Sequence, residues 1–176
     1  GMFLENPALE EFDINPLILY TQGACAVDAR IYRNDVKTPD PVVAAREMPT
    51  TLLDIHSIAI VGASSDPGKI GYAICRNLLP FPGRVYPVNP RGGTILGKTV
   101  YPSLAAIPDT VDLAVIAIPP GGVPAVIDEA GEKKIPLSLI ITSGFRESGA
   151  AGQELEKRIL ASAHESGMRI IGPNCL

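Results

Sequence analysis

The stretch Ser57-Ile-Ala-Ile-Val-Gly-Ala-Ser-Ser-Asp-Pro-Gly-Lys-Ile-Gly71 decides the fold of this chain. It joins a short apolar run, Ser57–Val61, to a turn with three glycines and then to a segment with helical periodicity. A continuous apolar run is typical of a parallel strand that helices cover on both faces. Glycines let the backbone turn sharply, and free amides at a helix start favour an anion. The stretch therefore predicts a strand, a phosphate-binding turn and a helix.

Apolar runs of the same kind recur at residues 85–88, 113–118, 137–141 and 168–171. The intervening segments carry apolar residues at helical spacing, in three groups: Ile70, Ile74 and Leu78; Val123, Val126, Ile127 and Ala130; Leu155, Ile159 and Ala163. In the last group Glu154 and Arg158 are spaced for an ion pair, and Gly167 is placed to end the helix. This alternation predicts an α/β fold, Rossmann-like and doubly wound, with a mainly parallel sheet.

The composition argues against several classes of protein. The chain has 176 residues, 46% of them hydrophobic, and a net charge of −4, which suits one main domain without a basic surface for nucleic acid or membrane. No apolar run approaches the roughly 18 residues that span a bilayer, and no secretion signal is recognisable. Cys25, Cys75 and Cys175 lack metal-ligand spacing. We expect a cytoplasmic protein with free thiols.

The first fifty residues have a different pattern. Two β-rich runs, at 12–20 and 24–31, flank Thr21-Gln22-Gly23, which predicts a β-hairpin. Residues 34–51 are polar and contain three prolines, which indicates an extended linker. We therefore expect a hairpin over 1–33, a linker over 34–52 and the Rossmann-like domain over 53–176.

The glycine turn departs from two familiar phosphate loops. A P-loop has four residues between its glycines and a Ser or Thr after its lysine. Here five residues separate Gly62 from Gly68, and Ile70 follows Lys69. The turn is also longer than the dinucleotide Gly-x-Gly allows, although Gly68 and Gly71 keep the final spacing of that motif. The longer turn leaves room for a larger ligand, and a turn that only connects strand to helix is the alternative.

The loops after two later strands carry further candidates. Val88-Asn-Pro-Arg-Gly-Gly93 has Arg91 where an NAD-binding fold places a carboxylate. Arg91 suits a phosphate on the adenine ribose, as in coenzyme A or NADP, or is an ordinary solvated residue. Ile118-Pro-Pro120 follows another strand at its carboxyl end. It either walls a ligand channel or merely ends the strand.

Together these residues resemble the coenzyme A-binding domain of nucleoside-diphosphate-forming acyl-CoA synthetases, such as ADP-forming acetate–CoA ligase and the succinyl-CoA synthetase α subunit. The resemblance covers residues 53–176 and also rests on Thr142-Ser-Gly-Phe-Arg-Glu147 and Gly172-Pro-Asn-Cys175. It implies that the Ile118-Pro-Pro120 loop and the Gly144-Phe-Arg-Glu147 stretch approach the pantetheine and thioester end of coenzyme A. It implies cofactor contacts from Gly62, Ala63, Ser64, Ser65, Gly68, Lys69, Ile70, Gly71, Asn89, Pro90, Arg91, Ile118, Pro119, Pro120 and Asn174.

The N-terminal hairpin contains Glu11-Phe-Asp-Ile-Asn-Pro-Leu17 followed by Ala26-Val-Asp-Ala-Arg-Ile31, and these stretches resemble the last hairpin of an ATP-grasp domain. By that resemblance Asn15 and Asp28 match Mg²⁺ ligands, which would act only with ATP and the rest of that domain. The family also passes phosphate through a histidine in a following domain. We assign His56 and His164 to structure or solvent and name no catalytic residue in this chain.

Two further residues stand in motifs of the family. We interpret Cys175 as a small buried residue, because no histidine base accompanies it. Glu147 is open between catalysis and capping of the following helix.

The resemblance implies a specific function for the chain. We expect the coenzyme A-binding part of an ADP-forming acyl-CoA synthetase, which converts an acid, coenzyme A and ATP into acyl-CoA, ADP and phosphate. This part would bind coenzyme A without turnover, and its partners would be the other domains or subunits of the parent. The alternatives are the coenzyme A-binding part of a lysine acetyltransferase of the same family, or a non-catalytic module that senses NADP(H) or coenzyme A.

Overall fold

The structure is a computed structural model that describes residues 9–14, 17–19, 24–26, 29–33 and 55–175. The chain divides into two compact units, residues 1–49 and 50–176, and each is described by itself.

The N-terminal unit contains the predicted hairpin as four short strands. These are β1 (Leu9–Ile14), β2 (Leu17–Leu19), β3 (Ala24–Ala26) and β4 (Ala29–Arg33). The strand β1 pairs with β4, and β2 pairs with β3, both antiparallel. The two ladders share one register, because Leu19 lies opposite Ala24 and Ile14 lies opposite Ala29. The predicted hairpin is therefore present among the described residues as two short antiparallel ladders.

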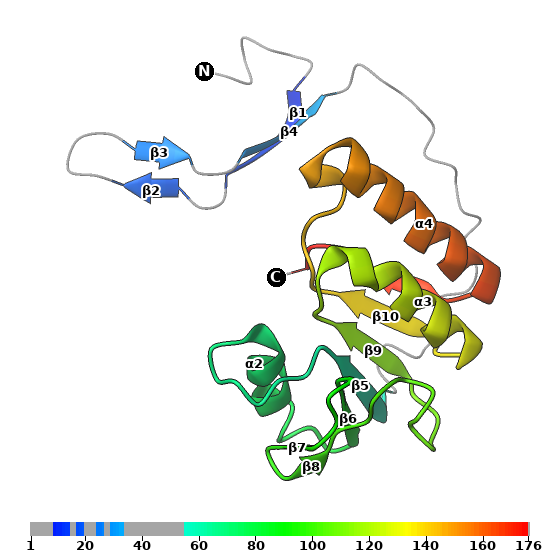
Figure 1. Cartoon of the computed structure of the whole chain (residues 1–176). Helices are drawn as coiled ribbons and strands as arrows, with labels where there is room; N and C mark the ends of the chain where they lie inside the picture. The colour runs from blue at the N-terminus through cyan, green and yellow to red at the C-terminus, as the bar shows by residue number, and fades with distance from the viewer. Residues whose placement is uncertain (1–8, 15–16, 20–23, 27–28, 34–54, 176) are drawn as a thin grey trace. The chain divides into compact units, whose positions relative to one another are not determined.

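A five-stranded parallel sheet forms the C-terminal unit (Figure 1). Its strands are β5 (Ser57–Val61), β6 (Arg84–Val88), β9 (Leu113–Ile116), β10 (Leu137–Ile140) and β11 (Arg169–Ile171). They lie in the order β11-β10-β9-β5-β6, and every neighbouring pair is parallel. The winding direction therefore reverses between β5 and β9, as in a flavodoxin-like doubly wound sheet. The predicted α/β fold is confirmed.

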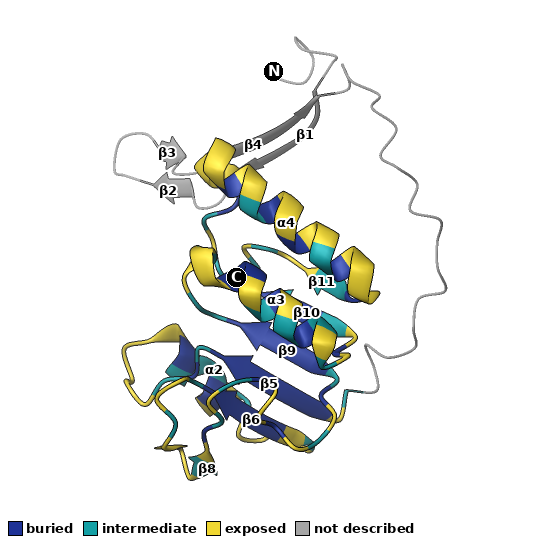
Figure 2. Ribbon diagram, turned by 45° about the vertical axis from the view of Figure 1, so that its right-hand side comes forward, coloured by how far each residue is buried: buried dark blue, intermediate teal, exposed yellow. Residues whose placement is uncertain are grey.

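Helices cover the two faces of this sheet, α3 (Val123–Glu132) and α4 (Ala150–Ser166) on one face and α2 (Ile70–Asn77) on the other (Figure 1). In β5, Ala59 and Val61 pack into the α3–α4 core while Ile58 and Ile60 pack into the α2 core. Figure 2 shows the central strands buried on both faces. This two-sided burial explains why the strands are continuous apolar runs. Among the described residues, no helix has the length and apolar character needed to cross a membrane.

Helix α4 ends as predicted, but its ion pairs differ from the prediction. Gly167 follows the helix in the left-handed conformation, with φ of 72°. The expected Glu154–Arg158 pair is wrong. Arg158 reaches Asp128 of the neighbouring helix α3 at 3.6 Å, while Glu154 pairs with Lys157 at 2.7 Å. The packing of α4 against α3 brings Arg158 to the Asp128 carboxylate, and the spacing of residues along one helix cannot predict such a contact.

The connection from β6 to β9 departs from the strand–helix alternation. It forms a tight hairpin of β7 (Thr94–Ile95) and β8 (Lys98–Thr99). Its two turn residues, Leu96 and Gly97, have φ of 49° and 79°, as a type I′ turn requires. Ile95 is buried in the α2 core, so this hairpin covers part of the sheet face beside that helix.

Asp112 ties β5 to β9 at the amino edge of the sheet. Its Oδ2 accepts hydrogen bonds from the amides of His56 and Ser57, each at 2.9 Å, and from the Ser57 hydroxyl at 2.8 Å. Burial raises the pKa of the Asp112 carboxyl, but these hydrogen bonds outweigh it and the net pKa is lowered. The clamp holds the edge opposite the loops that form the site.

Candidate functional site

Every predicted ligand-binding segment follows the carboxyl end of a strand. The glycine turn follows β5, the Arg91 loop follows β6, and the Ile118-Pro-Pro120 loop follows β9. The segments 142–147 and 172–175 come after β10 and β11. Parallel strands end at one edge, and the reversal of winding between β5 and β9 opens a crevice there. The fold therefore brings the predicted segments to a common edge.

The glycine turn lies directly against its neighbours at two points. Gly62 has φ of 94°, and a Cβ on it would overlap the carbonyl of Ala117 at the end of β9. A Cβ on Gly71, in the first turn of α2, would overlap the carbonyl oxygen of Gly62. Gly68 is different, because its Cβ would lie 3.4 Å from Asp66 Oδ1, an ordinary contact. The close approach therefore depends on glycine at 62 and 71.

Several amides of the turn remain free to bind a ligand. Asp66 holds the turn internally, since its amide donates to Ser64 Oγ at 3.0 Å and its Oδ1 accepts the Gly68 amide at 2.9 Å. Among the described residues, the amides of Ser65, Ile70 and Gly71 have no acceptor, and α2 has no side-chain cap. These N–H groups at the positive end of a helix can receive a phosphate.

Ala63 is fully buried at the base of the turn. Its amide donates to the Val88 carbonyl at 3.2 Å, and its carbonyl accepts the Asn89 side chain at 2.8 Å. Ala63 therefore supports the turn from within, and its predicted contact with a ligand stays a prediction.

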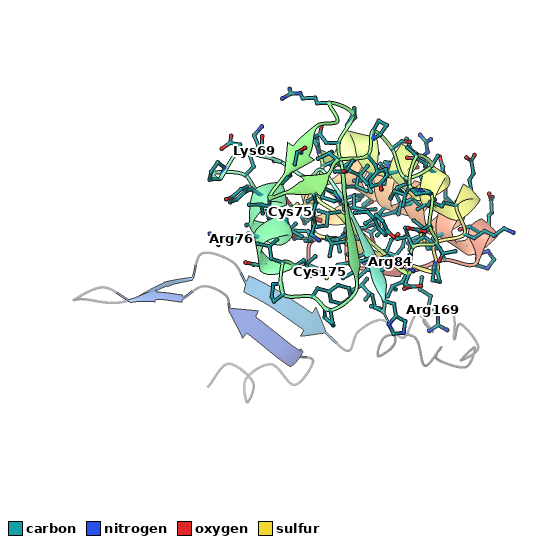
Figure 3. The ribbon with its side chains drawn as sticks, turned by 90° about the horizontal axis from the view of Figure 1, so that it is seen from below. Lys69, Cys75, Arg76, Arg84, Arg169 and Cys175 are labelled. Carbon is teal, nitrogen blue, oxygen red and sulfur yellow. The ribbon has the colours of Figure 1, made fainter. Side chains whose placement is uncertain are left out.

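Two basic side chains lie in the loops after β5 and β6, which are neighbouring strands. Lys69 is exposed and projects outward from the turn (Figure 3). Arg91 is also exposed, and its amide donates to Asn89 Oδ1 at 3.0 Å. Within the described part of the chain, neither side chain has a hydrogen-bond or ion-pair partner. They can offer positive charge to an anionic ligand.

A cavity of about 330 Å³ adjoins the turn and is lined mainly by apolar groups. Its lining residues are Ile70, Ala117, Ile118, Pro119, Pro120, Ile141, Thr142 and Ser143. Ile70 is 43% exposed and faces this cavity, whereas its predicted partners Ile74 and Leu78 pack against the α2 core. Ile70 therefore does not belong to the α2 core, although it shares the helical spacing of Ile74 and Leu78. An apolar cavity with few polar groups suits an uncharged ligand arm.

Short contacts join the loops around the cavity. Thr142 Oγ1 donates to the Ile118 carbonyl at 2.7 Å, and the Asn174 amide donates to the Thr142 carbonyl at 3.1 Å. A Cβ on Gly144 would lie 2.8 Å from Pro120 Cγ. Ala117 and Ile141 were missed as site residues by sequence reasoning, which placed them inside the predicted strands; each directly follows the last residue of its strand in the structure.

The loop after β10 is held by an ion pair that the sequence did not reveal. Glu156 of α4 is only 8% exposed, and Arg146 Nη2 lies 2.7 Å from its Oε1. Arg146 also donates its backbone amide to Glu156 Oε2 at 3.2 Å. The hydrogen bonds and charge of Glu156 raise the pKa of the Arg146 guanidinium.

Glu147 acts inside the same loop. Its Oε1 accepts the Gly144 amide at 2.6 Å, and α4 begins at Ala150 without a side-chain cap. The interpretation of Glu147 as the cap of α4 is therefore wrong.

The remaining candidates lie outside this edge or outside the described residues. His56 and His164 are exposed, before β5 and in the last turn of α4, at the opposite edge. Burial raises the pKa of the Cys75 thiol. Hydrogen bonds from the backbone amides of Ser64 and Cys75 partly offset this increase. Asn15 and Asp28 are not among the described residues. Within those residues, no three His, Cys, Asp or Glu side chains gather as a metal site would need.

Comparisons with known proteins agree with this geometry. A family model described as CoA binding domain matches residues 56–176. ADP-forming acetate–CoA ligase II of Archaeoglobus fulgidus is 41% identical over 173 residues, which is 97% of this chain and 25% of that protein. The α subunit of ADP-forming acetate–CoA ligase I of Pyrococcus furiosus is 46% identical over 70% of this chain and 28% of its own length.

A solved structure has the same fold. It is the dinucleotide-forming acetyl-coenzyme A synthetase 1 of Ca. Korarchaeum cryptofilum in complex with phosphate and ADP. The match has a TM-score of 0.67 and 46% identity, and it covers 70% of this chain and 27% of that one. The chain thus spans about a quarter of the length of these relatives.

Proposed function

We propose that this chain, which belongs to the family of CoA-binding domains, binds coenzyme A at the carboxyl edge of its parallel sheet. One residue carries the proposal. The amide of Ile70 has no acceptor among the described residues, and its side chain lines the apolar cavity. An anion-binding helix start therefore adjoins an apolar cavity, and coenzyme A joins phosphates to an uncharged pantetheine arm in the same way.

Each part of coenzyme A has a proposed place. The diphosphate lies on the free amides of Ser65, Ile70 and Gly71, with Lys69 beside it. Arg91 binds the 3′-phosphate of the ribose. The pantetheine arm enters the cavity between the β9 and β10 loops. The loop that contains Asn174 borders the thiol end, through its hydrogen bond to Thr142.

We further propose that the parent protein is a cytoplasmic ADP-forming acyl-CoA synthetase. The relatives reported above carry the names of acetate–CoA ligases, which favours a ligase over a lysine acetyltransferase or a nucleotide sensor. The Archaeoglobus relative matches 97% of this chain, which includes the N-terminal unit. This coverage supports the assignment of residues 1–33 as the end of an ATP-grasp domain that uses ATP and Mg²⁺.

Calorimetry on this chain tests the binding proposal. Coenzyme A should bind more tightly than dephospho-coenzyme A, because only the former offers the 3′-phosphate to Arg91. NADPH should bind more weakly than coenzyme A, because it lacks the pantetheine arm. Tighter binding of NADPH than of coenzyme A would contradict the proposal.

An activity assay tests the assignment to a larger enzyme. The chain incubated with acetate, ATP, Mg²⁺ and coenzyme A should form no acyl-CoA, because both histidines of this chain lie away from the site. Formation of acetyl-CoA by this chain alone would show that its own residues complete the catalytic machinery.

A further inference from the structure

We propose that Asn89 is a positioning residue that holds the glycine turn and the Arg91 loop in one fixed arrangement. The inference rests on the proposed coenzyme A site and deepens it. It assigns Asn89, predicted as a cofactor contact, to the selection of the 3′-phosphorylated cofactor through Arg91.

The side-chain amide of Asn89 bridges the two loops. Its Nδ2 donates to the Ala63 carbonyl at 2.8 Å, and its Oδ1 accepts the Arg91 amide at 3.0 Å. The Arg91 N–H needs an oxygen acceptor, so the NH₂ group must face the Ala63 carbonyl. Both polar atoms of the side chain therefore have protein partners.

The backbone of Asn89 is also held. Its amide donates to the Tyr101 carbonyl at 2.9 Å, and its carbonyl accepts the Gly92 amide at 2.9 Å. Asn89 is only half-buried, so this arrangement lies at the surface of the site. Because its backbone is fixed, the Asn89 side chain can hold the two loops at a constant distance from each other.

The glycine turn depends on the Asn89 side chain because Ala63, the residue that it binds, lies at the base of the turn. The amides of Gly62 and Ala63 both donate to the Val88 carbonyl, at 3.1 and 3.2 Å. Asn89 then binds the other side of Ala63 through its carbonyl. The turn is thus held from two directions by consecutive residues at the end of β6.

The consequence for the ligand is a fixed spacing between two phosphate sites. Free amides of the turn hold one phosphate, and Arg91 holds the other. A ligand with both phosphates gains from preorganised partners, because less ordering is needed on binding. A ligand that lacks the 3′-phosphate gains less. Asn89 should therefore affect the ratio of the two affinities.

Two substitutions separate the bridge from the local turn. In Asn89→Ser and Asn89→Thr the hydroxyl oxygen can still accept a hydrogen bond from the Arg91 amide. The side chain is too short, however, to reach the Ala63 carbonyl. Asn77→Ser is the matched control, since Asn77 is exposed at the end of α2 and makes no side-chain hydrogen bond among the described residues. Circular dichroism shows which variants are folded, and Asn89→Thr provides the test if Asn89→Ser is unfolded.

Calorimetric titration with coenzyme A and dephospho-coenzyme A gives the decisive readout. Asn89→Ser should weaken coenzyme A about five- to tenfold, and dephospho-coenzyme A by less, so that the affinity ratio falls. A merely structural role would lower the melting temperature and leave the ratio unchanged, which would overturn the proposal. If the unsubstituted chain binds no coenzyme A, the proposed function fails first. If it binds and the ratio survives in a folded variant, only the role of Asn89 is wrong.

Discussion

Gly71 packs directly against the carbonyl oxygen of Gly62, so that a Cβ at position 71 would overlap it. Gly71→Ala should therefore lower the free energy of unfolding by roughly 1–2 kcal/mol, because overpacking outweighs the better helix propensity of alanine. The added methyl group should also displace the free amides of the turn and thereby weaken the binding of coenzyme A. Urea denaturation and calorimetry measure the two effects. Gly121→Ala is the control, because a Cβ there meets nothing within 4 Å; equal stability of the two variants would contradict the close approach.

Arg91 should distinguish the two forms of the cofactor. Arg91→Ala removes an exposed guanidinium that has no partner in the described part of the chain, and we expect coenzyme A to lose about 1–2 kcal/mol of binding free energy. Dephospho-coenzyme A should lose much less. Arg76→Ala, which removes an exposed arginine in the last turn of α2, should leave both affinities unchanged. Equal losses for both ligands on substitution of Arg91 would show that another group binds the 3′-phosphate.

The Arg146–Glu156 pair should contribute more to stability than the Glu154–Lys157 pair. The carboxylate side chain of Glu156 is 11% exposed, whereas Glu154 and Lys157 are 72% and 71% exposed. A double-mutant cycle with alanine substitutions should give a coupling free energy of about 1 kcal/mol for the first pair and about 0.3 kcal/mol or less for the second. The measurement is urea unfolding of each variant. Similar coupling in both pairs would show that burial of Glu156 adds nothing.

Asp112 should make stability depend on acid pH. Its pKa in the folded chain is lowered from 3.8, so the folded state binds fewer protons than the unfolded state. The stabilisation is present above the unfolded pKa and is lost as the pH falls through the folded pKa. The stability difference between the natural chain and Asp112→Asn should therefore be constant above about pH 5 and shrink below about pH 4.

The Ser57 hydroxyl provides the check on this assignment. Ser57→Ala removes the donor that lies 2.8 Å from Asp112 Oδ2, so the pKa of Asp112 in the folded chain should rise toward its unfolded value. The acid-dependent loss of stability should then be smaller and complete at a higher pH. An unchanged acid profile in both variants would assign the effect to other carboxylates.

The strands could be predicted because burial on both faces leaves a direct mark in the sequence. The predicted run 57–61 has the same bounds as β5. The predicted run 113–118 is two residues longer than β9, which ends at Ile116. Ala117 and Ile118 line the apolar cavity instead. Apolar character alone cannot distinguish the end of a strand from the wall of a cavity.

The helix-facing predictions show the same limit. Ile70 has the helical spacing of an apolar stripe and Arg158 the spacing of a local ion pair, yet Ile70 faces the cavity and Arg158 pairs with Asp128 of α3. Spacing identifies which residues share a helix face. It does not identify what lies opposite that face.

The glycine turn itself was a matter of local sequence. Residues 57–71 determined a buried strand, a sharp turn and a helix start. Glycine at 62 permits a φ of 94°, and glycine at 71 has no Cβ, and both features can be read from the residue type alone. Only the tertiary structure decided the strand order, which places β5 beside β9 and β6. It also decided that Asn89 reaches Ala63 and that Thr142 reaches Ile118. These contacts join residues more than twenty positions apart, and such pairings arise from packing of the whole sheet, which no local pattern contains.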